Sequence, residues 1–272
     1  MTTSAAQQVA PRGPARGSHA PALVLFCLFV IQPCGTATAG AGDPWSDALA
    51  AKDLAAIESL LDQDGVDPDR RTTGDKTALM FAAREGALDT VARLLAVGAD
   101  ANARNANGGT PLMYAALGGD PAVTRLLLEA GAQPGLQAKL GWTALGVAAV
   151  KGHAAVAGIL LETGADQGVR DAYGWTPLMR AVHSRRPDVV RMLLKAPGAD
   201  LSVRQESGAT ALHIAAATGD LEMVRMLLEN GADRRARDSR GNTPAATARA
   251  SGHPELADYL EDRARTARAE SN

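Results

Sequence analysis

Between residues 108 and 132, apolar positions recur three and four residues apart in two short runs, which predicts two helices. The first helix follows Thr110, whose hydroxyl can accept a hydrogen bond from a free N–H of the first turn. Pro111 suits the next position, because its missing N–H is not needed there. A glycine pair ends this helix and Gly131 ends the second, since glycine adopts the left-handed conformation at little cost. Two such helices cannot bury their apolar faces alone, but a stack of pairs can.

The same pattern returns along most of the chain. Six copies align on a threonine that is followed by Pro or Ala, at intervals of 33, 33, 33, 34 and 33 residues, and a G-A-[DQ] turn recurs behind it. The threonines are Thr77, Thr110, Thr143, Thr176, Thr210 and Thr243. Residues 44–62 lack this threonine but keep the helical spacing, so they are predicted to be a divergent first unit that caps the stack. The chain therefore consists of one repeated unit rather than a domain with a unique core.

These residues closely resemble the ankyrin repeat. The pattern G-x-T-P-L-x-x-A-A-x-x-G followed by V-x-x-L-L-x-x-G-A-D carries the resemblance, which covers about residues 47–260. It implies an all-α fold, an α-solenoid of helix-turn-helix units with β-turn or hairpin-like loops, whose loops and inner helices face a partner. We expect one ankyrin-repeat domain over residues 40–272, with an N-cap unit at about 44–73, repeats at about 74–106, 107–139, 140–172, 173–206 and 207–239, and a C-cap unit at about 240–270.

The fifth unit departs from the pattern in two places. Arg185 and Arg186 stand where the other units have glycine followed by a small or polar residue or histidine, and Pro197 adds one residue. The favoured interpretation is a tolerated surface irregularity, because loops accept insertions easily. The alternative is a local change in curvature that shapes the binding surface.

The first 39 residues differ in kind. Arg12 and Arg16 precede an apolar run at 22–31, and small residues follow up to Ala39, which predicts a secretory signal peptide cleaved after Ala39. A membrane anchor is the less favoured alternative, because a spanning helix needs about 20 apolar residues. Lipidation of Cys34 is a second alternative, against which the preceding proline argues. The rich use of Ala, Arg and Gly is typical of a high-GC bacterium, so we expect an exported, periplasmic protein without a stable membrane span after cleavage.

Composition narrows the function classes. Both cysteines, Cys27 and Cys34, lie in the leader, so the mature chain has no disulfide. Without the leader's two arginines the chain has 26 basic against 30 acidic residues, a net charge of about −4. This weakly negative net charge does not favour binding to the phosphates of a nucleic acid.

The sequence contains no recognisable set of catalytic or metal-binding residues. His153 and His253 both follow the glycine that ends a first helix, which indicates a scaffold role, and His213 occupies the T-x-L-H slot that is common in ankyrin repeats. His183 alone is off-pattern, and one histidine does not make a metal site. We therefore expect no enzyme activity, no cofactor and no metal site.

We expect binding residues at the positions that vary between the repeat units. Five of the seven aromatic residues of the mature chain occupy variable positions around the threonine, and the ankyrin resemblance places these positions at the turn tips and on the concave face. Trp, Tyr and Arg are enriched at interface hot spots. The predicted partner-binding residues are Phe81, Tyr114, Lys139, Leu140, Trp142, Tyr173, Trp175 and Arg180. The alternative is that each ring packs along its own turn and shields the core.

The sequence thus favours an exported, monomeric, non-catalytic module that binds a protein partner through its concave face as a scaffold, assembly factor or stabiliser. A stoichiometric inhibitor or immunity-type protein that blocks a periplasmic or secreted enzyme would use the same surface and is the alternative.

Overall fold

The computed structural model describes residues 44–63, 65–72 and 74–269, and side-chain placement to residue 261. The predicted signal peptide at 1–39 lies outside the described residues. The described residues form fourteen α-helices and one short 3-10 helix, η1 (Lys139–Gly141), with no strand among them. None of these helices has the length and apolar content to cross a bilayer. The prediction of an all-α fold is confirmed.

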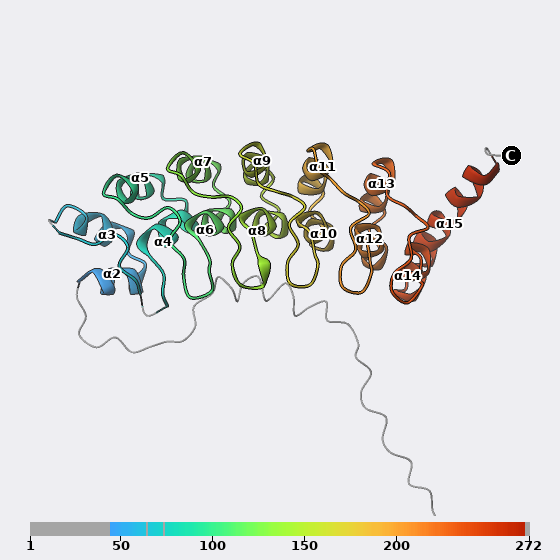
Figure 1. Cartoon of the computed structure of the whole chain (residues 1–272), viewed down its shortest axis with the longest axis horizontal. Coiled ribbons are helices and arrows are strands. Elements are labelled where there is room, and N and C mark those ends of the chain that lie inside the picture. The colour runs from blue at the N-terminus through green and yellow to red at the C-terminus, as the bar shows by residue number, and fades with distance from the viewer. Residues whose placement is uncertain (1–43, 64, 73, 270–272) are drawn as a thin grey trace, which may run out of the picture.

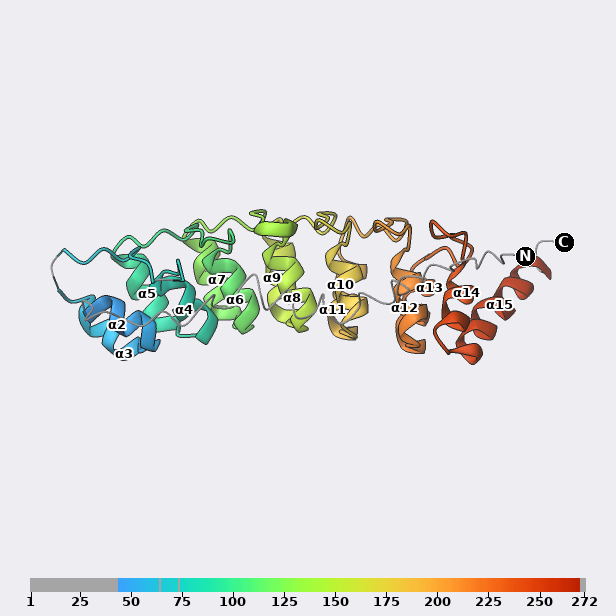
Figure 2. The same ribbon diagram turned by 90° about the horizontal axis from the view of Figure 1, so that it is seen from below.

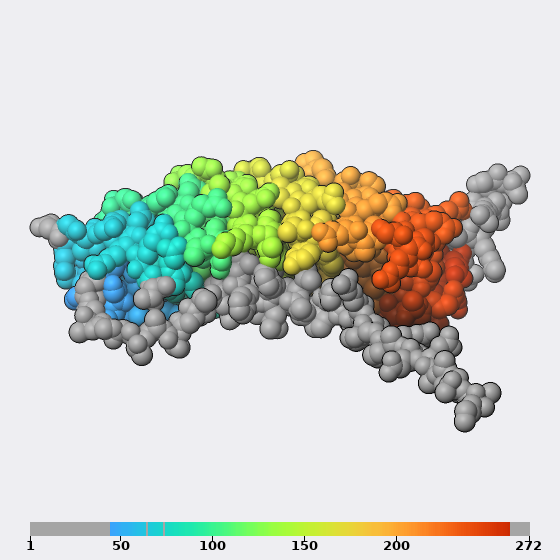
Figure 3. Space-filling view, turned by 60° about the horizontal axis from the view of Figure 1, so that its bottom comes forward, coloured from blue at the N-terminus to red at the C-terminus, as the bar shows by residue number. Residues whose placement is uncertain are grey.

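The helices form pairs that stack side by side into one elongated body (Figure 1). The first helices of the units line one side of the stack: α2 (Pro44–Ala51), α4 (Ala78–Glu85), α6 (Pro111–Gly118), α8 (Ala144–Lys151), α10 (Pro177–His183), α12 (Ala211–Thr218) and α14 (Pro244–Ala250). The second helices line the other side: α3 (Leu54–Leu60), α5 (Leu88–Ala96), α7 (Pro121–Glu129), α9 (Ala154–Glu162), α11 (Pro187–Lys195), α13 (Leu221–Glu229) and α15 (Pro254–Ala269). In the space-filling view, neighbouring units abut without a break (Figure 3).

The repeated threonines begin the first helices, as predicted. The Thr110 hydroxyl accepts a hydrogen bond from the Met113 N–H at 3.3 Å, and Thr143 accepts one from the Gly146 N–H at 3.1 Å. Helix α6 is capped at its C-terminus by Gly119, which has a φ of 88°. These caps satisfy amides that have no partner inside the helix. The repeat signature therefore specifies where the first helix starts in each of the six units that carry the threonine.

The first helices form the centre of the core. Seven of the eight residues of α8 are buried, because helices on both sides and its own second helix cover it. Helices α4 and α6 approach closely: a Cβ placed on Gly118 would lie 2.1 Å from the Arg84 carbonyl oxygen. The absence of a side chain at Gly118 is what permits this approach.

The two arginines of the fifth unit take over scaffold positions. Arg185 has a φ of 52°, in the left-handed region that glycine occupies in other units. The Arg186 Nε donates to the Val150 carbonyl at 3.0 Å, across 36 residues. The His153 Nε2 contacts the Leu117 carbonyl at 3.3 Å across the same interval, so Arg186 replaces a histidine in the same role. These contacts favour the interpretation of a tolerated irregularity.

Candidate protein-binding face

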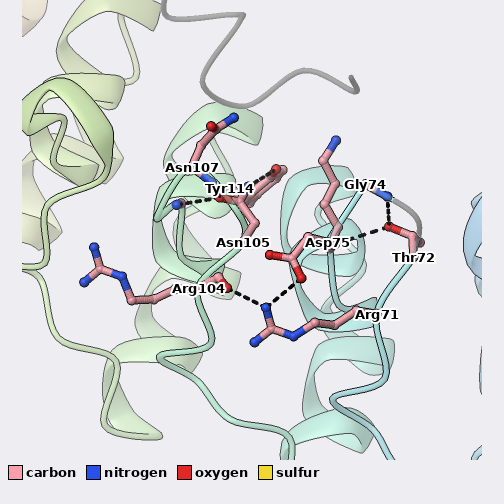
Figure 4. Close-up of polar contacts among 10 residues, drawn as sticks. Arg71, Thr72, Gly74, Asp75, Arg104, Asn105, Asn107 and Tyr114 are labelled. Carbon is pink, nitrogen blue, oxygen red and sulfur yellow. Dashed lines mark hydrogen bonds and ion pairs between the residues drawn. The ribbon is translucent and has the colours of Figure 1, made fainter. Parts of the chain in front are cut away.

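The turns that join the units are held by side-chain oxygens. In the turn that begins at Asn105, Oδ1 accepts hydrogen bonds from the N–H groups of Asn107 at 2.9 Å and Gly109 at 2.8 Å. The Asn105 Nδ2 donates to the Tyr114 hydroxyl at 3.0 Å, which ties the turn to helix α6 (Figure 4). Burial raises the pKa of Tyr114 to about 12, so the phenol is neutral at physiological pH.

Arginines link each turn to the next. Arg71 donates to the Arg104 carbonyl at 2.7 Å and to the Asp75 carboxylate at 2.9 Å (Figure 4). Arg170 donates to the Arg204 carbonyl at 2.6 Å, and Arg104 and Arg204 make the same kind of contact with the following turn. These arginines are not among the predicted site residues, although arginine recurs at this position at the repeat interval. Gln137 occupies it in one turn.

The turn tips also bond to one another through the backbone. The Lys139 N–H donates to the Asn107 carbonyl at 2.8 Å, and the Ala172 N–H donates to the Leu140 carbonyl at 2.9 Å. The Ser239 N–H makes the equivalent bond, at 2.9 Å. Seen from below, the turns form a row along one long edge of the molecule (Figure 2). This row is a continuous backbone platform from which the tip side chains project.

A cation lies between two indole rings under the middle of this row. The Arg180 guanidinium carbon is 4.7 Å from the centroid of the Trp142 ring and 4.6 Å from that of Trp175. The Asp171 Oδ2 accepts from Arg180 Nε at 2.8 Å and from Nη2, so the buried charge is paired. The His183 ring meets Trp175 edge to face, with centroids 5.3 Å apart. The open space among Trp142, Trp175 and Arg180 is only about 10 Å³, too little for a ligand.

A second cation lies near two aromatic rings at the N-terminal end. The Lys76 Nζ is 5.7 Å from the centroid of the Phe81 ring and 5.8 Å from that of Tyr114. Burial lowers the pKa of Lys76, and the positive charges of Arg84 and Lys52 lower it further. Both clusters join residues of adjacent units, so they stabilise the stack as well as the turns.

The fold and these repeated turns agree with comparisons of the chain with known proteins. A family model described as ankyrin repeats (3 copies) matches residues 46–138 and 118–205, and one described as ankyrin repeats (many copies) matches residues 202–248. The chain belongs to the ankyrin-repeat family. Ankyrin repeats are in general protein–protein interaction modules, and the fold is typically non-catalytic.

Two known proteins are similar in sequence to part of this chain. Mouse ankyrin repeat domain-containing protein 63 is 40% identical over 88 residues, which are 31% of this chain and 22% of that protein. Mouse protein phosphatase 1 regulatory subunit 27 is 39% identical over 80 residues, which are 29% of this chain and 52% of that protein. The match thus spans from about a fifth to about half of these relatives' length.

Two solved structures match the architecture more fully. The ankyrin repeat domain of Bcl-3 has a TM-score of 0.68 at 29% identity, covering 80% of this chain and 99% of that chain. The human ASB11 ankyrin repeat domain has a TM-score of 0.70 at 29% identity, covering 80% of this chain and 98% of that chain. The solenoid is therefore an ankyrin-repeat stack in its arrangement as well as in its sequence.

In the structure, the eight predicted binding residues lie in two layers, one buried and one at the surface. Phe81, Tyr114, Trp142 and Arg180 are no more than 6% exposed, so the prediction that they lie on the partner-facing surface is wrong. They lie under the surface because the neighbouring unit packs against the start of each first helix. For these rings the alternative, packing along the turn, describes their placement.

The outer layer consists of the other four predicted residues. Lys139 is exposed, and Leu140, Tyr173 and Trp175 are half-buried. Trp175 belongs to both layers, because its ring contacts Arg180 while part of its surface remains accessible. Whether these four side chains contact a partner stays a prediction. Asp171 and Lys76 hold the buried layer together but are not among the predicted residues. The recurrence of Asn105, Asp171 and Asp238 at one position of the repeat is the sequence signal for Asp171.

In the part of the chain that the structure describes, no three or more His, Cys, Asp or Glu side chains group together as metal ligands would. His213 is buried, and its ring nitrogens contact Thr210 and the Asn242 carbonyl. His213 therefore connects two units of the scaffold.

Proposed function

We propose that this protein binds a protein partner at the turn tips of its central units, through Lys139, Leu140, Tyr173 and Trp175. The observation that carries the proposal is the fixed Trp142–Arg180–Trp175 stack beneath these tips. A surface that is already ordered loses little conformational freedom when a partner docks, so more of its contact energy appears as affinity. Tyrosine and tryptophan are also side chains that interface hot spots favour.

The proposed role is that of a non-catalytic scaffold, assembly factor or stabiliser of its partner. The family supports this role, because its members act by binding. We also propose that the chain works after export, with its leader removed at Ala39. The charged, apolar and small-residue segments of the leader support this proposal.

Capture of a partner from a periplasmic extract tests the proposed face. The double variant Lys139→Ala with Tyr173→Ala removes two tip side chains and leaves the buried stack intact. We expect it to lose capture, because each hot-spot truncation typically costs about 2 kcal/mol or more of binding free energy.

The matched control is Arg125→Ala with Glu162→Ala, an exposed pair on α7 and α9, where the nitrogen–oxygen distance is 3.8 Å. Both double variants should keep the circular dichroism spectrum and thermal transition of the wild type. Equal capture by the tip variant and the control would exclude the tips as the binding site.

A further inference from the structure

One turn of the row differs from the rest in the hydrogen bonding of its backbone N–H groups. In five of the six turns with the repeat signature, a side-chain oxygen accepts a hydrogen bond from the N–H two residues further along. These oxygens belong to Thr72, Asn105, Asp171, Gln205 and Asp238. In four of the turns the same side-chain oxygen also accepts from the N–H four residues further along. The sixth turn has Ala138 at this position.

The Ala138 turn therefore lacks an acceptor for the amides of Leu140 and Trp142. Among the residues that the structure describes, neither N–H makes a hydrogen bond of normal geometry. Leu140 also has a φ of 61° and a ψ of 18°, a left-handed conformation that is unfavourable for a residue with a Cβ. The equivalent residues of the other turns, Gly74 and Asn107 among them, do not have positive φ values.

The surroundings of this turn favour an anion. Lys139 is exposed, and its ammonium forms no ion pair with any carboxylate in the described part of the chain. Two equivalent turns carry a carboxylate in the corresponding slot, from Asp171 and Asp238. Backbone N–H groups beside a cation are a recurrent means of binding carboxylates. The tips on both sides hold the turn in place through the bonds of Lys139 and Leu140.

We infer that the Ala138 turn is a carboxylate-binding site and that its occupant is an Asp or Glu side chain of the protein partner. The carboxylate accepts from the Leu140 and Trp142 amides, where Asp171 serves its own turn, and pairs with Lys139. Binding favours the ordinary conformation of the other turns and so relieves the left-handed Leu140. This inference rests on the proposed function and specifies the chemistry of the partner.

Sodium acetate is the probe of the site itself. In the ¹⁵N-labelled full chain, acetate should shift the amide protons of Leu140 and Trp142 downfield more than those of any other turn. Sodium chloride at equal ionic strength should not. The variant Ala138→Asn supplies the missing side-chain oxygen, so it should abolish the acetate shift and lower the HN–Hα coupling constant of Leu140 toward that of a negative φ. Equal shifts with chloride, no shift with acetate, or an unchanged shift in Ala138→Asn would overturn the inference.

Partner binding separates this inference from the proposed function. Ala138→Asn should weaken the captured partner's affinity about tenfold, the change that corresponds to roughly one charge-assisted hydrogen bond. Asp238→Ala, which removes the same kind of oxygen from a distant turn, should leave the affinity unchanged. If Lys139→Ala with Tyr173→Ala abolishes capture while Ala138→Asn does not weaken it, the carboxylate site is wrong and the binding face stands. If neither variant affects capture, the proposed face is wrong, and the acetate titration alone decides whether the turn binds carboxylates.

Discussion

At the scale of single residues, one slot serves different chemistry in different units. The fourth residue after the repeated threonine is Tyr114 in one unit and Arg180 in another, and both side chains are buried. The tyrosine places its hydroxyl on Asn105, whereas the arginine is neutralised by Asp171. A buried charge is costly unless it is paired, so Arg180 depends on the Asp171 carboxylate at the start of its turn.

His213 shows the same dependence on its neighbours. The Thr210 N–H donates to its Nδ1 at 3.2 Å, which places the ring proton on Nε2, and Nε2 donates to the Asn242 carbonyl at 3.1 Å. Burial lowers the pKa of this ring below its ordinary value of 6.5, against smaller opposing effects of the Asn242 bond and the Asp238 charge. The native ring is therefore neutral over part of the range in which the unfolded ring is charged.

We expect His213 to make the free energy of unfolding sensitive to acid. Above pH 6.5 both states are neutral and its contribution is complete; as the pH falls through the lowered native pKa, the unfolded state binds the proton first and stability is lost. His213→Met should show a smaller loss between about pH 7 and about pH 5 in urea unfolding. Equal losses in the variant and the wild type would assign the acid sensitivity to other groups. Methionine is the matched replacement, since it occupies this slot in Met80, Met113 and Met179.

At the scale of helices, the distance between neighbouring units decides which side chains are allowed. Helices α4 and α6 are close enough that Gly118 faces the Arg84 carbonyl directly. The same position is Lys151 in α8 and Thr218 in α12, where a side chain is accommodated. The α4–α6 contact is thus specific to one pair of units, although all units share one sequence pattern.

Gly118→Ala should destabilise the protein. The added Cβ would lie 2.1 Å from a backbone oxygen, so the two helices must separate, and overpacking of this kind typically costs about 1–3 kcal/mol. Gly146→Ala is the matched control within α8, because its Cβ would make only ordinary contacts, the nearest at 3.5 Å. The control should gain up to about 1 kcal/mol from helix propensity. Urea midpoints measure both changes, and a Gly118→Ala variant as stable as its control would show that the close approach relaxes freely.

At the scale of the whole molecule, the units form a stack in which each contacts mainly its neighbours. Residues 1–39 differ from the repeats in composition, with two arginines, no acidic residue and both cysteines. If they are a signal peptide, the exported chain should begin at Gly40 when its N-terminus is sequenced after expression in a Gram-negative host. Recovery of a periplasmic chain that retains Cys34 would contradict cleavage at this site.

The sequence by itself determined the repeat, the family and the start of the first helix in each of the six units that carry the threonine. These properties depend on local chemistry: Thr110 caps the eight-residue helix that directly follows it, and Gly119 caps the other end of that helix. Their signals lie within one unit and recur in the others, so a single chain is enough to recognise them.

Only the tertiary structure decided which of the predicted binding residues reach the surface. Arg180 is buried between Trp175 of its own turn and Trp142, which lies 33 residues from Trp175 in the preceding unit. The unsatisfied amides of the Ala138 turn likewise stand out only beside the five turns that have an oxygen in that place. Burial and hydrogen bonding in a stack depend on the adjacent unit, and the distance to that unit is a property of packing that no local pattern contains.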